Sequence, residues 1–533
     1  MRVRIKELLK EIKPLRDLRI AYADGRFDRQ TRGFVRRYFQ EGHTRTEGKE
    51  IGFVVEPWPL DTALPSYVVV LAMAFMHRGR RVRILWDDTP FATGPGNERY
   101  LQRRIGRVLE RLPAALPVSR LSSYSPDAVS LLSGEDFASL ARLNTFRKFL
   151  TETPPEVSRG FEEAARRTLN LTARRVQTLY GALKLDYVIA PGGIYRTSGV
   201  FVKVGKKMGV RVATLDSGPT VLLISTDGVA SYLDDIPRAF RGLKPEDDWV
   251  IEEAREEFDR RLKGSDAFNY QRVAAAGNVV WNGVLIPLNQ SFDSSALGRH
   301  RVFGSQTDWM LETVAWLLEH TTEDVAIRRH PVERLERMKS RDDYRGRLME
   351  RFGTERRIRY IGADEPVNTY DLLLGARVVI PHVSTVGIEA AALGIPVVTQ
   401  SDSYYADMGF VWSAKTRAEY IDLLRKAVSG ELRVSESQKA DAWRCYYLSQ
   451  RCNFFPSRFT PGQITSIVRE LPGSILSGKD IDTLCQAYES NSPLAQVVHN
   501  MKREAVSGGS DSTGVFRGIR TKNEEESPER KNI

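Results

Sequence analysis

The sequence predicts an α/β protein made of two doubly wound, Rossmann-like domains. Apolar, strand-like runs alternate with helical patterns along most of the chain, as expected for parallel sheets covered by helices. Several polar or glycine-containing segments follow directly after the apolar runs, at the position where open α/β sheets bind ligands. The 533 residues, 41% hydrophobic and 28% charged, are enough for two globular domains with sizeable cores.

The N-terminal domain is predicted to extend over residues 1–285 and to contain two βαβ units. Its expected elements are strand 51–55, helix 66–77, strand 82–86, strand 187–190, helix 200–207 and strand 210–215. Residues 96–180 have a mostly helical pattern, which a Pro- and Ser-rich stretch over residues 112–126 interrupts. Two βαβ units in succession predict a parallel sheet.

A second domain of the same kind is predicted over residues 286–475. Its expected elements are strand 279–288, helix 307–320, strand 324–327, strand 358–361, helix 369–374 and strand 378–380. Residues 476–502 are expected to form a helical segment. Residues 503–533 are rich in Gly, Ser, Lys and Glu and are expected to be disordered. Two such domains facing a central cleft correspond to the GT-B architecture.

The most informative stretch, residues 378–398, reads VVIPHVSTVGIEAAALGIPVV. A buried strand ends at Pro381, and a short helix follows with Thr385 at its N-cap position. The start of this helix therefore points at the crevice beyond the strand. Unpaired backbone N–H groups, the helix dipole and the hydroxyls of Ser384 and Thr385 favour a phosphate there.

Glu389 lies one turn into this helix, on the same face as Thr385. A capping box would place the acid three residues after the cap, where Ile388 stands, so a reciprocal cap does not explain Glu389. A carboxylate that faces a cleft can accept two hydrogen bonds from a ribose diol. We favour this role over a solvated or structural glutamate.

His330 is the second chemical signal. It follows the apolar run 325–327 and two arginines, and Pro331 restricts it to extended geometry. A histidine at the carboxyl end of a strand faces the ligand crevice of an open sheet. As an imidazolium it could balance or protonate a departing phosphate. A histidine in a turn is more often only a turn residue, but Ser384 and Thr385 on the same sheet favour the functional interpretation.

The chain carries a formal net charge of +11, yet it shows no helix-turn-helix, zinc or RNP pattern, so we expect no nucleic-acid partner. Solvated basic faces are the default explanation. A nucleotide-sugar, an acidic glycolipid or the cytoplasmic membrane leaflet would also be attracted by this charge. The basic opening helix, residues 1–13, either packs as an ordinary helix or rests on a membrane surface.

Three cysteines, Cys445, Cys452 and Cys485, are too few for a disulfide framework and lack metal-site spacing. The N-terminus has no apolar core of a secretory signal, and the longest apolar run, residues 67–76, is too short to span a bilayer. We therefore expect a cytoplasmic protein that is soluble or peripheral on the inner face of the membrane. The D-x-D pattern at residues 480–482 lies beyond both predicted sheets, so no metal site is expected.

Three segments, in this order, resemble the bacterial capsular polysaccharide biosynthesis family: PLNQSFDSS at 287–295, RRHP at 328–331, and STVGIEAAALGIPVV with SYYADMGF within 384–410. That family includes inverting β-Kdo transferases that use CMP-Kdo, and it is similar in site logic to bacterial CMP-sialic acid transferases. The resemblance covers roughly residues 186–410 and is stronger in the C-terminal half. It implies that His330, Ser384 and Thr385, with Gly387 in the same motif, engage the donor phosphate and that Glu389 engages ribose.

The family also carries an acidic residue in an E-D-G loop of the N-terminal domain, and this residue serves as base. Here the loop reads LDSG, which makes Asp216 the candidate, and the nearby TDG makes Asp227 the alternative. Asp216 could equally cap a helix or close a turn. The family's Phe-Leu-Arg-Ser continuation is absent after Gly218, and its glutamine near Pro287 is Asn289 in this chain. Further candidates beside the donor are Asn289, Asp293, Arg329, His382 and Tyr405.

Together these groups predict a metal-independent transfer of a Kdo-like or other sugar from a nucleotide-sugar, CMP-linked by resemblance, to a surface or capsular polysaccharide or a glycolipid. Asp216 would remove the acceptor proton while the phosphate leaves toward His330, with inversion at the anomeric carbon. The nucleotide-sugar is a co-substrate, and no cofactor is expected. Two alternatives stay open: a sugar-nucleotide epimerase of the same architecture, and a non-catalytic polysaccharide-assembly protein.

Overall fold

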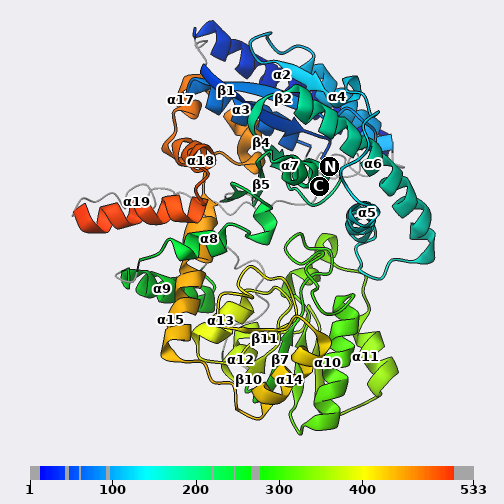
Figure 1. The fold of residues 1–533 in the computed structure, drawn as a ribbon, viewed down its shortest axis with the longest axis vertical. Coiled ribbons are helices and arrows are strands. Elements are labelled where there is room, and N and C mark those ends of the chain that lie inside the picture. The colour runs from blue at the N-terminus through cyan, green and yellow to red at the C-terminus, as the bar shows by residue number, and fades with distance from the viewer. Residues whose placement is uncertain are drawn as a thin grey trace, which may run out of the picture.

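The computed structural model describes residues 13–42, 47–58, 62–91, 96–218, 221–244, 247–265, 277 and 279–508. They form two α/β domains, one around a seven-stranded sheet and one around a four-stranded sheet (Figure 1). This arrangement confirms the predicted fold class, two Rossmann-like domains of the GT-B type.

The N-terminal sheet has the strand order β13-β6-β5-β4-β1-β2-β3, in which the five strands β1 to β5 are parallel. The order reverses between β1 and β4, which is the switch point of a doubly wound sheet. Its elements are α2 (Lys13–Gln40), β1 (Glu47–Val55), α3 (Leu64–His77), β2 (Arg80–Trp86), α4 (Gly96–Leu109), β3 (Val118–Arg120), α5 (Gly134–Phe149), α6 (Arg159–Ala182), β4 (Leu185–Pro191), α7 (Ser198–Met208), β5 (Val212–Ser217), β6 (Val221–Ser225), α8 (Ile236–Arg241) and α9 (Trp249–Lys263).

The sequence pattern did not predict two strands of this sheet, β3 and β6. The three residues of β3 lie inside the stretch 112–126 that we expected only to interrupt helices, and β6 runs antiparallel to β5. Both strands are short: β3 has three residues, and β6 has five, of which Leu222, Ile224 and Ser225 are buried. A short apolar run cannot by itself be told from part of a buried helix.

The C-terminal sheet has the order β10-β7-β8-β9, and all its strands are parallel. Alternate residues of β7 point into two different cores: Val284 and Ile286 pack with α10, α11 and α14, whereas Leu285 packs with α12 and α13. The elements are β7 (Gly283–Pro287), α10 (Gln306–His320), β8 (Val325–Arg328), α11 (Tyr344–Phe352), β9 (Ile358–Ile361), α12 (Thr369–Leu374), β10 (Ala376–Val379), α13 (Val386–Ala392), β11 (Val398–Thr399), β12 (Trp412–Ser413) and α14 (Arg417–Val428).

After α14 the chain returns to the N-terminal domain, which differs from the predicted division at 285/286 and 475/476. Strand β13 pairs antiparallel with β6, and β7 spans the predicted boundary at residue 285. The returning elements are α15 (Glu436–Tyr446), the π-helical segment η7 (Tyr447–Asn453), β13 (Phe455–Pro456), α16 (Ile464–Ile467), α17 (Pro472–Leu476), α18 (Lys479–Ser490) and α19 (Leu494–Gly508). Composition does not change where the chain crosses between domains, so the sequence carries no signal for the return.

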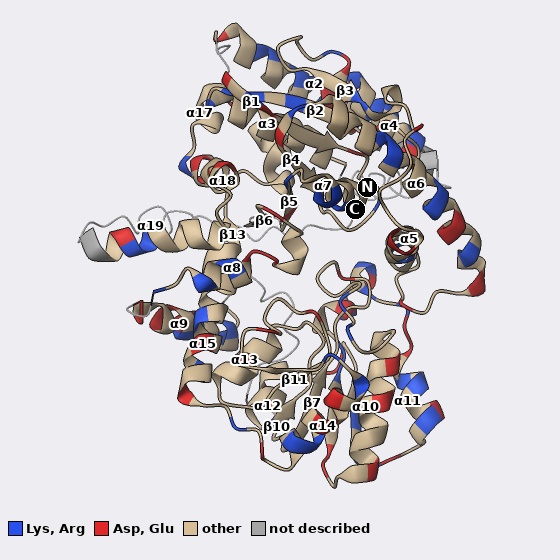
Figure 2. Ribbon diagram, in the orientation of Figure 1, with Lys and Arg blue, Asp and Glu red and all other residues tan. Residues whose placement is uncertain are grey.

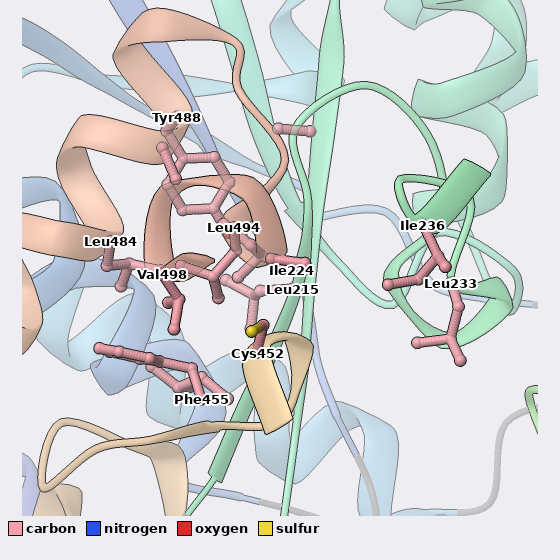
Figure 3. Close-up of a cluster of buried hydrophobic side chains, with 14 of the residues drawn as sticks. Leu215, Ile224, Leu233, Ile236, Cys452, Phe455, Leu484, Tyr488, Leu494 and Val498 are labelled. Atoms are coloured by element: carbon pink, nitrogen blue, oxygen red, sulfur yellow. The ribbon is translucent and has the colours of Figure 1, made fainter. Parts of the chain in front are cut away.

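Packing fixes this return in place. Figure 3 shows Tyr488 of α18, Leu494 and Val498 of α19, and Phe455 gathered beside Leu215 and Ile224 of the N-terminal sheet. All six side chains belong to one buried apolar cluster. The C-terminal helices therefore cover one face of the N-terminal sheet.

The two predictions for the chain ends fall mostly outside the described residues. Of the opening segment 1–13, only the backbone of Lys13 is described, as the start of α2. The helix α19 continues to Gly508, past the predicted start of the disordered tail at residue 503, and residues 509–533 lie outside the description. Among the described helices, none is both long and apolar enough to cross a membrane.

Candidate functional site

A cleft of about 330 Å³ lies between the carboxyl ends of strands from both domains. From the N-terminal domain it is lined by Asp216, Ser231 and Tyr232, and helix α9 adds Arg261. The C-terminal domain contributes Asn289, Asp293, Arg299, His330, Ser384 and Thr385. The structure thus brings together six residues that the sequence singled out, from segments far apart in the chain.

His330 follows β8 and has the extended backbone that Pro331 favours, with φ −59° and ψ 124°. Its Nδ1 accepts a hydrogen bond from the backbone N–H of Val332 at 3.2 Å. Burial lowers the pKa of His330 to about 4, and the nearby Arg328 and Arg261 add to this against Glu333. The side chain is therefore neutral, with its proton on Nε2, rather than the imidazolium that we expected.

Ser384 and Thr385 lie at the start of α13, but they cap it differently from the prediction. Thr385 occupies the N-cap position with helical backbone angles, and its side chain makes no capping hydrogen bond. The hydroxyl of Ser384 instead accepts the N–H of Val386 at 3.3 Å. Because the Thr385 hydroxyl is not used as a cap and lines the cleft, it can contact a ligand.

Gly387 does not line the cleft but determines how closely the chain packs behind it. A Cβ at this position would lie 2.6 Å from the hydroxyl oxygen of Tyr405 and 2.9 Å from Pro381. Tyr405 is fully buried, and its hydroxyl donates to the carbonyl of Ser384 at 2.7 Å. Both residues therefore hold the Ser384 loop in position, and Tyr404 lines the cleft in place of Tyr405.

Glu389 is 0% exposed and does not line the cleft. Its Oε1 accepts a hydrogen bond from the Tyr370 hydroxyl at 3.2 Å and lies 3.5 Å from Nε of Arg261. Arg261 also donates to Gln450 at 3.2 Å. In this geometry Glu389 contacts the cleft through Arg261, whose guanidinium it orients, and direct ribose binding stays a prediction.

Asp216 lies near the end of β5 and faces the cleft. Its Oδ2 accepts from the Ser231 hydroxyl at 2.5 Å, and its Oδ1 accepts from the N–H of Ser217 at 2.7 Å. Burial raises the pKa of Asp216 above its ordinary value; the hydrogen bond from Ser231 opposes the rise, and Asp293 adds to it. A raised pKa makes a carboxylate a stronger base, which suits proton removal.

Asp227, the alternative base, lies away from the cleft. Strands β5 and β6 form an antiparallel hairpin in which Ser217 pairs with Leu222 and Thr214 pairs with Ser225. The turn that carries Asp227 is therefore at the opposite end of the hairpin from Asp216, and Asp227 is exposed. The sequence did not reveal that the chain reverses direction at β6. Asp216 and Asp227, only eleven residues apart, therefore both remained candidates for the base.

Asn289 and Asp293 line the cleft from the loop after β7. The side-chain oxygen of Asn289 accepts the N–H of Val383 at 3.2 Å, which ties this loop to the one after β10. Burial raises the pKa of Asp293, and hydrogen bonds from Ser295 and the charge of Arg147 oppose the rise. Asp293 is thus a second carboxylate in the cleft, supplied by the opposite domain from Asp216.

Arg329 and His382, two further candidates, lie outside the cleft lining. Arg329 forms an ion pair with Glu333 at 2.7 Å and donates to the carbonyl of Ser340 at 2.9 Å. His382 is buried, with Nε2 3.1 Å from the carbonyl of Ala296. Both side chains hold loops together: Arg329 ties the residues after β8 to Ser340, and His382 ties the residues after β10 to Ala296.

Two arginines of the cleft were missed by sequence reasoning. Arg261 continues the buried stripe of α9 formed by Val250, Ala254 and Phe258, so an arginine on an apolar helix face was a usable signal. Arg299 lies 3.9 Å from Asp234 and stacks over Tyr232 at 4.4 Å, and no pattern in the sequence marks it. These cations give the cleft affinity for anionic groups.

A second acidic pair lies at the carboxyl edge of the N-terminal sheet, outside the cleft lining. The hydroxyl of Thr197 is 2.6 Å from Glu56 and is also hydrogen-bonded to Asp87. A hydroxyl has one proton, so one of the two carboxyls must itself be protonated. Burial raises the pKa of Glu56 to about 7, against the charge of Arg196.

Residues 257–427 match the model of the family described as "Capsule polysaccharide biosynthesis protein". The match covers about a third of the chain. It contains five of the cleft residues that sequence analysis predicted, including Asn289, His330 and Ser384. No curated protein sequence gives a match.

Among solved structures, the chain resembles two proteins from Thermosulfurimonas dismutans. One is KpsC, beta Kdo 2,4 transferase, at 17% identity over 49% of this chain and 79% of that one, with a TM-score of 0.34. The other is KpsC, beta Kdo 2,7 transferase, at 12% identity over 57% and 90%, with a TM-score of 0.32. The UDP-GlcNAc 2-epimerase of Methanocaldococcus jannaschii is similar at 12% identity over 74% and 97%, with a TM-score of 0.26. Likenesses this weak carry no functional argument.

Proposed function

We propose that this protein is an inverting glycosyltransferase that moves a sugar from a CMP-linked donor to a surface or capsular polysaccharide or a glycolipid. The observation that carries the proposal is the shared cleft, in which a carboxylate of one domain, Asp216, faces a phosphate-type site of the other. The match of residues 257–427 to the capsule polysaccharide biosynthesis family model supports the same assignment. The three buried, free cysteines are consistent with action in the cytoplasm.

On the donor side, neutral His330 donates Nε2–H to an oxygen of the leaving phosphate, and Arg261 supplies the positive charge. The hydroxyls of Ser384 and Thr385 complete the set of donors. Two arginines and an imidazole can stabilise a departing phosphate directly, so we propose that no metal ion is needed. Negative charge develops on the leaving phosphate in the transition state. Groups that stabilise this charge bind the transition state more tightly than the substrate, and so they lower the barrier.

On the acceptor side, Asp216 removes the proton from the attacking hydroxyl as that oxygen bonds to the anomeric carbon. The bond between this carbon and the phosphate oxygen breaks in the same displacement, which inverts the configuration. Ser231 and the Ser217 N–H hold the carboxylate so that a lone pair faces the cleft. This cleft geometry favours the transferase over a non-catalytic assembly protein, for which Asp216 would have no reason to face the cleft.

The test is calorimetric titration of the purified protein with CMP, UDP, GDP and CDP. We expect CMP to bind most tightly and His330→Ala to weaken it about tenfold to a hundredfold, the worth of one hydrogen bond to a charged group. His320→Ala, a change at an exposed histidine on α10, is the matched control. Preference for UDP would redirect the proposal to UDP-sugars, and absence of nucleotide binding would refute the donor site.

Product analysis separates transfer from epimerisation. A transferase consumes the nucleotide-sugar only when an acceptor is present, apart from slow hydrolysis. An epimerase converts the nucleotide-sugar alone into a second nucleotide-sugar. Conversion without acceptor, abolished by Asp216→Asn, would contradict the transferase.

A further inference from the structure

The outer side of the N-terminal domain carries an unusual row of arginines along α4. Arg99, Arg103, Arg107 and Arg111 are all exposed, and each follows the previous one after four residues. Four-residue spacing places side chains on one face of a helix, and the row continues just beyond the helix end at Leu109. The row is about 18 Å long at a rise of 1.5 Å per residue.

Helix α2 lies beside α4 and extends this row into a face. The Tyr100 hydroxyl donates to Asp24 at 2.9 Å, and Arg32 donates to the carbonyl of Arg107 at 2.9 Å, so the two helices run in the same direction. The exposed positions of α2 include Arg26, Arg29 and Arg36 (Figure 2). We call the following set the arginine face: Arg26, Arg29, Arg36, Arg99, Arg103, Arg107 and Arg111.

In the part of the chain that the structure describes, Arg107 is the member of this face that pairs with an acid: its Nη2 lies 3.7 Å from Asp28. Asp24 and Asp28 point inward and bind Arg104 at 3.0 Å and 2.8 Å. Arg32 lies on α2 beside α4. Its pKa is lowered by burial first and then by the positive charge of nearby Arg111. Within the described residues, Arg99, Arg103 and Arg111 form no ion pair.

On other helices of the chain, exposed arginines form ion pairs with acidic residues one turn away. On α14, Arg425 pairs with Asp422 at 3.1 Å, and on α11, Arg347 pairs with Glu350 at 3.1 Å. Like charges four residues apart destabilise a helix, so the row on α4 lowers the stability of the element that carries it. Helix stability therefore does not explain the arginine face, whereas contact with an anionic partner would offset the repulsion.

We propose that the arginine face binds the surface of an anionic phospholipid bilayer. The face is carried by two helices that lie side by side, so its arginines can contact a plane of headgroups together. Each guanidinium can form paired hydrogen bonds with a phosphate. Tyr22, 69% exposed, follows the same face of α2 and is a residue type favoured at membrane interfaces. This inference goes beyond the proposed transferase, because it assigns a surface outside the cleft.

The test is co-sedimentation of the full chain with phosphatidylcholine vesicles, with and without phosphatidylglycerol. We expect binding only to the anionic vesicles, weakened by salt. Replacing Arg99, Arg103, Arg107 and Arg111 together with Gln should reduce the partition coefficient by about 100-fold or more, since each basic residue near the surface contributes to the attraction. The matched control replaces Arg345, Arg347, Arg351 and Arg356, exposed on and near α11, with Gln and so removes the same charge.

Three results would overturn the proposal. The control set could reduce vesicle binding as much as the α4 set, which would mean that net charge alone is responsible. The α4 set could leave vesicle binding unchanged. The wild-type protein could ignore vesicles but bind a soluble polyanion such as heparin through the same arginines, which would identify a polymer as the partner. Thermal melting and nucleotide titration of each variant verify folding, and they separate this proposal from failure of the donor site.

Discussion

The carboxyl edges of the two sheets present different chemistry. The N-terminal edge carries carboxyl groups whose pKa burial raises, Glu56, Asp87 and Asp216. The C-terminal edge carries a neutral imidazole and hydroxyl groups at His330, Ser384 and Thr385, with Asp293 as the exception. One edge is suited to accept protons and the other to donate hydrogen bonds to an anion. A transfer reaction needs both, and neither domain supplies both alone.

The largest expected effect separates the two acids near β5. Asp216→Asn should lower the transfer rate by about 10²- to 10⁴-fold, because the acceptor hydroxyl loses its base. Donor affinity should stay unchanged, since Asp216 lies on the acceptor side. The measurement is sugar transfer under saturating donor together with nucleotide titration. Asp227→Asn is the control and should leave the rate as it is; an equal loss in both variants would show that Asp216 is not the base that the cleft uses.

The next prediction concerns how the stability of the protein depends on pH through the buried carboxyl groups of the N-terminal edge. The folded-state pKa of Glu56 is raised from 4.5 to about 7. The proton bound by the folded state therefore stabilises the protein below about pH 4.5, and this contribution is lost as the pH rises through 7. At about 1.4 kcal/mol per pH unit, the loss is about 3 kcal/mol. Glu56→Gln should flatten this dependence in denaturant titrations, whereas Glu110→Gln, at an exposed site, should not; an unchanged slope in Glu56→Gln would show that Glu56 is ionised.

The next prediction concerns the packing of Gly387 against Tyr405, which holds the Ser384 loop at the carboxyl edge of the C-terminal sheet. Gly387→Ala places a methyl group 2.6 Å from the Tyr405 hydroxyl and should destabilise the fold by about 1–3 kcal/mol. Tyr405→Phe removes that oxygen and should recover part of the loss in the double variant. Thermal denaturation of the two single variants and the double variant measures the coupling. Strictly additive losses would mean that the Ala side chain is accommodated elsewhere.

The smallest expected effect concerns Thr385. Its hydroxyl makes no capping bond, so Thr385→Ala should change the free energy of unfolding by less than about 0.5 kcal/mol. Thr416→Ala is the matched comparison, because Thr416 caps α14 by accepting the N–H of Glu419 at 3.2 Å, and its loss should cost about 1 kcal/mol. Equal costs at the two sites would show that the Thr385 hydroxyl is structural.

The difference between the edges also explains what the sequence could predict. His330, Ser384 and Thr385 follow the apolar runs 325–327 and 378–380, and these runs place them at a carboxyl edge. Asp216 and Asp227 flank β6, whose reversal is not visible in the sequence, and only the paired register separates them. Roles that depend on packing, such as those of Gly387 and Glu389, follow from contacts between distant residues and have no local pattern.

The return of the chain to the N-terminal domain also affects how the molecule is made. The edge strand β13 and the helices that cover β5 and β6 come from the last described part of the chain, residues 455–508. During synthesis on a ribosome, the N-terminal sheet is translated first but cannot be completed until the C-terminal domain has emerged. Until then the apolar side chains shown in Figure 3 stay exposed to water. A chain released before α18 should therefore aggregate or be degraded, even though it contains every residue of the cleft.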